Sequence, residues 1–332
     1  MNCRFDSRRQ FLRRSGALCA AAPLAGVPRA WGQAVTTKIL CGTPAGSIPD
    51  YVARRYAEAL TTRRPGSAFV ENRPGAAGQI AITALKQATP DGGTIMLAPG
   101  AVSSIYPFLY GKLSYDPDAD LQPLSSAAEA TLALAVGPAV PDSVRTLEHF
   151  IAWSRANPAL ANFGSPGQGT LPHLLSALFF HEAKVAAQHA GYAGGPPAVV
   201  DLLGGRIAAL SLPEGLLRPH HESRKLRILA TSGPVRSTFL PDVPTFVEQG
   251  FPNLVIREWF AFFAGGSVPA SIASSTSQTI RAAAEGSPLA AAFREMGMVV
   301  VTSTPEATKE RIVSERQYWK AALTMTGIRA EL

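Results

Sequence analysis

Ser165 is the residue of this chain whose setting most invites a chemical role. It lies in the glycine-rich segment Gly164-Ser165-Pro166-Gly167-Gln168-Gly169-Thr170, directly after a short apolar run. A nucleophilic serine needs a Gly-x-Ser-x-Gly turn between a strand and a helix, and the first glycine of that motif is missing here. We therefore favour a binding role, in which Thr170 caps the next helix and Ser165 hydrogen-bonds either a ligand or its own turn.

Two carboxylates stand where helices are expected to begin. Asp50 follows Pro49 at such a start, where it can complement the helix dipole and also face a cleft. Glu214 follows an expected strand at residues 207–212. Glu214 is either a solvated acid in the first turn of a helix or a selectivity element, which would repel a dianion and pair with a ligand ammonium.

The histidines and cysteines predict neither a metal site nor a cofactor. None of the six histidines has metal-ligand spacing. His173 alone is a candidate for ligand contact, and a structural role one turn into its helix is the alternative. Cys41 ends an apolar run, which predicts a buried thiol rather than a nucleophile.

The first 34 residues have the three parts of a secretory signal. A cluster of five arginines includes the pair in Ser7-Arg8-Arg9-Gln10-Phe11-Leu12, a weakly apolar stretch covers residues 15–27, and small residues suit cleavage after Ala34. The arginine pair followed by Phe11-Leu12 indicates the twin-arginine route, and a general secretory signal is the alternative. We expect the protein to be periplasmic.

Cleavage would change the charge of the chain. The whole sequence has 31 basic and 24 acidic residues, a net charge of +7. Residues 1–34 hold six arginines and one aspartate, so the remaining chain has 25 basic and 23 acidic residues and a net charge of +2. The excess of basic residues that would suggest nucleic-acid binding is therefore largely removed with the signal. The apolar stretch of the signal is also shorter than the ~20 residues of a transmembrane helix.

Short apolar runs alternate with segments of helical spacing along the rest of the chain. The expected strands are residues 38–41, 68–71, 94–98, 132–136, 162–163, 185–189, 207–212 and 226–231. Residues 256–264 form a long apolar and aromatic run that could lead back to the first lobe. Helices are expected between them and at the end of the chain, where Ile312, Trp319 and Leu323 share one face. The βαβαβ order predicts parallel, doubly wound sheets in two lobes, with a cleft at the carboxyl ends of the strands.

Seven motifs resemble, in order, those of one known family. They lie at residues 44–54, 70–78, 90–92, 113–117, 164–173, 201–205 and 240–245. The most recognisable is Val70-Glu71-Asn72-Arg73-Pro74-Gly75-Ala76-Ala77-Gly78. The family is the periplasmic solute receptors of tripartite tricarboxylate transporters, also called Bug receptors, and the resemblance covers essentially the whole mature chain.

The resemblance implies an α/β, two-lobed Venus-flytrap fold, with a mostly parallel sheet flanked by helices in each lobe. It also implies a cleft for a small ligand that usually carries a carboxylate. The ligand-binding candidates that it implies in the first lobe are Ala45, Gly46, Ile48 and Asp50. Those in the second lobe are Ser165, Gly167, Gly169, Thr170, His173, Gly194 and Gly195, to which we add Glu214 for its position after a strand.

Three departures from the family pattern bear on the ligand. Ile48 and Pro49 replace the middle of the first loop, and Pro49 has no N–H to offer. The later loop, Gly191-Tyr192-Ala193-Gly194, lacks the lysine usual in the family, and Glu214 adds a negative charge. These departures predict a ligand that is less anionic than citrate.

The sequence thus predicts a receptor rather than an enzyme. We expect residues 1–34 to be the signal peptide, residues 36–130 and 258–332 the first lobe, and residues 131–257 the second. We expect a monomer that closes on a small organic ligand, carboxylate or amino-acid-like, for membrane transporter subunits. A ligand-sensing subunit of a membrane signalling protein remains an alternative, as does a serine-dependent hydrolase.

Overall fold

The computed structural model describes residues 36–63, 66–286 and 288–330. These residues belong to one compact unit, Ala34–Leu332. The expected signal peptide and its cleavage site lie outside the described residues. No helix of the described part is long and apolar enough to cross a membrane.

The first part of the sheet follows the βαβαβ order that the sequence predicts. Its strands are β1 (Thr37–Cys41), β2 (Ala68–Asn72) and β3 (Thr94–Pro99), and its helices are α1 (Ile48–Arg63) and α2 (Gln79–Lys86). The three strands are parallel in the order β2-β1-β3. Helix α1 buries Val52, Tyr56 and Leu60, the face expected from their spacing.

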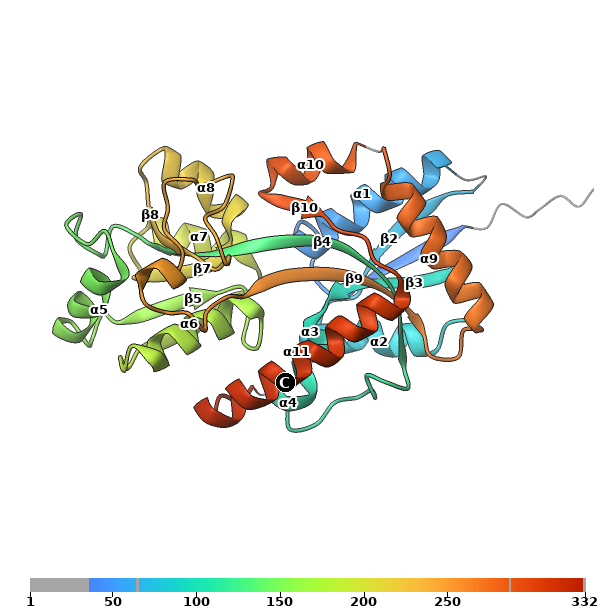
Figure 1. Cartoon of the computed structure of the whole chain (residues 1–332), viewed down its shortest axis with the longest axis horizontal. Coiled ribbons are helices and arrows are strands. Elements are labelled where there is room, and N and C mark those ends of the chain that lie inside the picture. The colour runs from blue at the N-terminus through green and yellow to red at the C-terminus, as the bar shows by residue number, and fades with distance from the viewer. Residues whose placement is uncertain (1–35, 64–65, 287, 331–332) are drawn as a thin grey trace, which may run out of the picture. The chain divides into compact units, whose positions relative to one another are not determined.

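Two long antiparallel strands, β4 (Leu121–Val136) and β9 (Arg257–Gly265), run side by side through the middle of the molecule (Figure 1). Their register extends from Leu121 opposite Gly265 to Thr131 opposite Arg257, with two irregularities on the way. Strand β9 also pairs with β3, and the short β10 (Met298–Val300) pairs with β4. Strand β4 is longer than the predicted run at 132–136, because its first residues include polar side chains and bulges that hide the strand pattern.

Beyond Thr131, β4 changes partners and enters the second part of the sheet. Its neighbours there are β7 (Ala209–Pro213) and β8 (Arg227–Thr231), both antiparallel to it. Strand β5 (Asn162–Ser165) is parallel to both β7 and β6 (Gln188–Gly191). The predicted strand at 185–189 begins three residues late, since its ladder starts only where Gln188 lies opposite Asn162.

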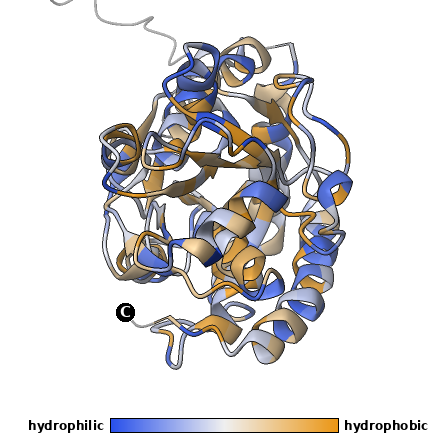
Figure 2. Ribbon diagram, turned by 90° about the vertical axis from the view of Figure 1, so that its left-hand side faces the viewer, coloured by the Kyte–Doolittle hydropathy of each residue, from blue (hydrophilic) through white to orange (hydrophobic). Residues whose placement is uncertain are grey.

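Helices flank both parts of the sheet. Those of the second part are α5 (Leu147–Ala156), α6 (Leu171–Glu182), α7 (Gly195–Leu203) and α8 (Glu214–Glu222). Those near the first part are η2 (Ala76–Gly78), α3 (Ala101–Ser104), α4 (Tyr106–Leu109), α9 (Ala270–Ala284), α10 (Leu289–Glu295) and α11 (Pro305–Thr326), and η3 (Val247–Gln249) precedes β9. Figure 2 shows the hydrophobic residues gathered in the strands and on the inner faces of the helices.

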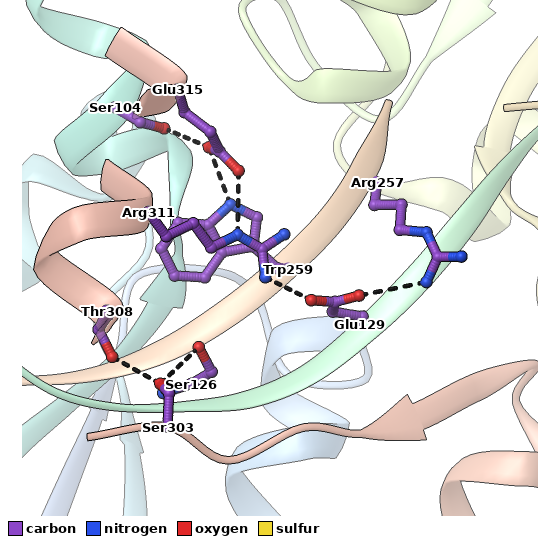
Figure 3. A network of polar contacts seen from close by, with 9 residues as sticks. All are labelled: Ser104, Ser126, Glu129, Arg257, Trp259, Ser303, Thr308, Arg311 and Glu315. Atoms are coloured by element: carbon purple, nitrogen blue, oxygen red, sulfur yellow. Dashed lines mark hydrogen bonds and ion pairs between the residues drawn. The ribbon is translucent and has the colours of Figure 1, made fainter. Parts of the chain in front are cut away.

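Helix α11 is tied to both long strands by a polar network (Figure 3). Arg311 and Arg257 both form ion pairs with Glu129 of β4. The guanidinium of Arg311 also lies 4.3 Å from the ring centre of Trp259 on β9. Glu315 accepts hydrogen bonds at 2.9 Å from both the Trp259 indole N–H and the Ser104 hydroxyl. The predicted buried face of Ile312, Trp319 and Leu323 is confirmed.

Replacing Glu315 by Ala is expected to lower the free energy of unfolding by about 1–3 kcal/mol, because a buried indole N–H and a buried hydroxyl lose a charged acceptor. Urea unfolding of the two proteins measures the difference. Glu310 is exposed on the same helix, so Glu310→Ala is the matched control and should change little. Equal effects of the two substitutions would contradict this role for Glu315.

Candidate functional site

A cavity of about 530 Å³ opens where the carboxyl ends of the parallel strands meet. Its walls come from the loops after β1, β5 and β6, from the turn at residues 74–78, and from the ends of β3 and β7. Tyr106, Tyr110 and Met296 also line it. Loops at the carboxyl ends of strands are where ligands bind in open α/β sheets, which makes this cavity the candidate ligand site.

Three helices begin at this cavity, namely α1, α6 and α7. Each has proline in its first turn, with Pro49 in α1, Pro172 in α6, and Pro196 and Pro197 in α7. Proline fits a first turn well, but it removes one of the N–H groups that would otherwise face a ligand. The remaining N–H groups and the positive ends of the helix dipoles favour an anion here.

The first loop of the cavity is held by Asp50, which is 2% exposed. One carboxylate oxygen accepts hydrogen bonds from the Gly46 N–H at 2.8 Å and from Arg54 Nε at 2.9 Å. The other accepts one from Asn72 Nδ2 at 2.8 Å, and the same Asn72 nitrogen reaches the Thr43 carbonyl. Asp50 therefore holds the first loop in place rather than facing the cavity. The Asn-Arg-Pro-Gly motif contributes to the same loop contacts through Asn72.

Burial alone would raise the pKa of Asp50, but hydrogen bonds from Arg54, Gly46 and Asn72 outweigh it and hold that pKa below its ordinary value. The carboxylate is therefore ionised at neutral pH. Its hydrogen bonds stabilise the fold most where it is charged.

The second-part loop of residues 166–170 is braced from behind by Ser165, His173 and His189. Ser165 is fully buried. Its hydroxyl lies 2.7 Å from His189 Nε2 and donates to the Gly167 carbonyl at 3.0 Å. His173 Nδ1 accepts the Gly169 N–H, and the two imidazole rings lie 4.1 Å apart.

Both imidazoles are neutral at pH 7. Burial, and then the neighbouring His189, lower the pKa of His173 to about 4, and burial also lowers the pKa of His189. Neutral rings leave a ring nitrogen free to accept the Gly169 N–H. Ser165 beside His189 forms the pair that a hydrolase would need, but Ser165 does not line the cavity.

The loops after β5 and β6 are also joined to each other. The Tyr192 N–H donates to the Ser165 carbonyl at 3.0 Å, and the Gly194 N–H donates to the Pro166 carbonyl at 3.1 Å. Gly194 has φ of 105°, a conformation that glycine adopts readily and other residues resist. This backbone bends so that the start of α7 faces the cavity.

The twelve predicted binding residues divide into two groups. Those that line the cavity are Gly46, Ile48, Gly167, Thr170, Gly194 and Gly195. Those that lie behind the lining are Ala45, Asp50, Ser165, Gly169, His173 and Glu214. Thr170 is the N-cap residue of α6, as expected, although its hydroxyl donates to the Gly167 carbonyl at 2.8 Å rather than capping the helix.

Glu214 begins α8, but it is buried rather than solvated, at 1% exposed. It accepts a hydrogen bond from the Ser237 hydroxyl at 2.6 Å. Burial raises its pKa to about 7, against opposing effects of Ser237, Arg218 and Arg257. The start of α8 packs closely on the turn before β10, since a Cβ at Gly215 would lie 1.8 Å from the Met296 carbonyl oxygen. Glu214 therefore belongs to a packing contact of α8.

A different carboxylate lines the cavity, and the sequence did not reveal it. Glu258 of β9 is partly buried, and among the described residues its carboxylate has no hydrogen-bond or ion-pair partner. Among the described residues that line the cavity, it is the one whose side chain carries a charge. Burial raises its pKa to about 7. The sequence signal for Glu258 was weak, because a single acid in an aromatic strand does not indicate which face it lies on.

A family model described as the tripartite tricarboxylate transporter family receptor matches residues 52–328. The chain belongs to this receptor family. The resemblance inferred from the sequence motifs is thereby confirmed.

Curated relatives agree with the family assignment. BugT of Bordetella pertussis (strain Tohama I) is 33% identical over 289 residues, which are 86% of this chain and 87% of BugT. A UPF0065 protein from the tcbD-tcbE intergenic region of Pseudomonas sp. (strain P51) is 30% identical over 280 residues, which are 83% of this chain and 82% of that protein.

Solved structures confirm the expected fold class. One described as a periplasmic transporter has a TM-score of 0.81 and 26% identity, and the match covers 89% of this chain and 98% of that one. The periplasmic binding protein BugD has a TM-score of 0.81 at 22% identity, covering 89% and 99% of the two chains. R. palustris Rpa4515, solved with adipate, has a TM-score of 0.82 at 24% identity, covering 89% and 98%. This receptor thus has the α/β fold of periplasmic binding proteins.

Replacing Asp50 by Asn is expected to destabilise the receptor by about 1–3 kcal/mol at pH 7, because the charged acceptor of three hydrogen bonds is lost. The pKa of Asp50 is lowered in the folded state. Its contribution is therefore present above its unfolded pKa of about 4 and is lost as the pH falls through the lower folded-state pKa. Urea unfolding at pH 7 and pH 2.5 should show a smaller difference between the two proteins at the lower pH. Asp242→Asn, at an exposed position, is the control, and an equal deficit at both pH values would contradict the assignment.

Replacing Glu258 by Gln is expected to raise the melting temperature of the ligand-free receptor more at pH 8 than at pH 5. The pKa of Glu258 rises from 4.5 to about 7 on folding. A raised folded pKa means that stability is lost as the pH climbs from about 4.5 to about 7, and the neutral amide of the variant avoids that loss. Calorimetry across this range measures the difference. For Glu248→Gln the pH dependence of the change in melting temperature should have the opposite sign, since the Arg236 hydrogen bonds lower the pKa of Glu248. A pH-independent effect of Glu258→Gln would refute the prediction.

Proposed function

We propose that the protein captures a small carboxylate-containing molecule in the periplasm for a tripartite tricarboxylate transporter. Membership of the receptor family supports the role. The observation that carries the proposal for this chain is the cavity at which α1, α6 and α7 all begin. The fold neighbour solved with adipate supplies the ligand class by analogy.

The contacts in this proposal come mainly from the backbone. The lining residues Gly46, Ile48, Gly167, Thr170, Gly194 and Gly195 contact the ligand. Behind them, Asp50, Ser165 and His173 hold the loops in place. No lysine, arginine or histidine is among the described residues that line the cavity. A carboxylate is therefore bound by N–H groups and helix dipoles rather than by a cationic side chain.

Binding in this proposal closes two lobes, residues 36–130 with 258–332 and residues 131–257, around β4 and β9. A ligand that contacts loops of both lobes stabilises the closed form, which the transporter subunits then recognise. Export follows the twin-arginine route, and the receptor acts as a monomer without cofactor.

Ala193→Trp is expected to abolish or strongly weaken ligand binding without unfolding the receptor. Ala193 lines the cavity but is itself exposed, so an indole there fills space that a ligand needs. The measurement is a thermal-shift screen of protein from the periplasmic fraction against organic acids and amino acids, followed by calorimetry on the hits. A ligand at 100 times its Kd should add about 2.7 kcal/mol of stability.

Ala307→Trp, at an exposed position on α11, is the matched control and should bind as the wild type does. Equal affinity of Ala193→Trp and wild type for a hit would place the ligand elsewhere. A wild-type protein that no acid stabilises, and that carries no small molecule detectable by mass spectrometry, would contradict the receptor role.

A further inference from the structure

The position of Glu258 on β9 places its side chain on the cavity side of the strand. Its two neighbours, Arg257 and Trp259, contact Glu129 and Glu315 on the side of α11 (Figure 3). Successive side chains of a strand point to opposite faces. Glu258 therefore points away from this network and toward the cavity that it lines.

The surroundings of Glu258 leave its charge uncompensated. The network on the other face already pairs Arg257 and Arg311 with Glu129. Among the described residues, none forms an ion pair or hydrogen bond with the Glu258 carboxylate, and its cavity neighbours are mostly apolar. The nearby group that responds to it is Tyr106, whose pKa is raised by burial first and also by the charge of Glu258.

An uncompensated carboxylate in an apolar cavity is costly, and buried charges in proteins are normally paired. The cavity offers no cationic side chain among its described lining residues. The missing partner can therefore come from the ligand. The same cavity has helix starts that suit a carboxylate. The helix starts therefore favour a negative group of the ligand, whereas the wall with Glu258 favours a positive one.

We propose that Glu258 binds a protonated nitrogen of the ligand, so that this receptor prefers carboxylates that also carry an ammonium group over plain monoacids and diacids. The inference rests on the proposed function, since it assumes that the cavity is the ligand site. It assigns to Glu258 the selectivity role that the sequence suggested for Glu214. Glu214 has a hydroxyl partner in Ser237 and lies outside the cavity lining.

The test uses sets of three acids that differ in one group. The sets are 6-aminohexanoate with hexanoate and adipate, 4-(aminomethyl)benzoate with 4-methylbenzoate and terephthalate, and L-phenylalanine with 3-phenylpropanoate and benzylmalonate. Calorimetry measures the Kd of each acid for the wild type. In at least one set, the amino acid should bind about tenfold or more tightly than both of its relatives.

Glu258→Gln should remove that preference, weakening the amino acid at least about tenfold while leaving the monoacid within about twofold. Glu214→Gln and the surface variant Glu248→Gln should keep the wild-type preference. The proposal is overturned if a diacid or monoacid binds the wild type best in every set. It is also overturned if Glu258→Gln keeps the preference, or if Glu214→Gln is the variant that loses it.

The two proposals fail in different ways. If the acids bind the wild type but those with an ammonium group bind no more tightly than the others, the receptor function is supported and the role of Glu258 is refuted. If the acids bind the wild type and Ala193→Trp with equal affinity, the cavity is not the site and both proposals fall.

Discussion

The antiparallel pairing of β4 with β9 is the constraint on which the rest of this structure depends. Both strands belong to the first part of the sheet. Strand β4 alone continues into the second part, where it lies between β7 and β8. The loops that form the cavity are therefore placed relative to one another through this pair. Helix α11 secures it by contacting Glu129 on β4 and Trp259 on β9 at once.

Polar residues in this receptor mostly act one step away from the cavity. Asp50 and Asn72 hold the first loop, while Ser165, His173 and His189 hold the loop after β5. Each places backbone groups rather than its own side chain at the cavity surface. In the proposed function, such a cavity binds its ligand through N–H groups and shape. One lining side chain such as Glu258 then has a large influence on the ligand charge that the cavity accepts.

The sequence predicted the parts of the fold that depend on local pattern. The βαβαβ start and the apolar face of α11 follow directly from periodicity, and the glycine-rich motifs identified the family. The beginning of β4 was missed, because residues 121–131 include polar side chains and a proline whose pairing is visible only once β9 lies beside them.

Contacts between residues far apart in the sequence could not be predicted for the same reason. His189 meets Ser165 and His173 only because β6 lies next to β5, and no spacing along the chain relates these residues. Glu214 and Glu258 look equivalent in the sequence, each an acid next to a strand or within one. Their surroundings in the fold distinguish them, since Glu214 begins α8 and accepts a hydrogen bond from Ser237, whereas Glu258 lines the cavity.

The prolines at the starts of α1, α6 and α7 have a consequence for how such a receptor changes its ligand over evolution. Because proline fixes φ near −65°, these first turns have less backbone freedom to follow a molecule of another shape. The N–H groups that remain are held in place before any ligand arrives, so little conformational entropy is lost there on binding. New specificity is then most readily gained by exchanging side chains on the wall, while the backbone frame of the cavity is inherited unchanged.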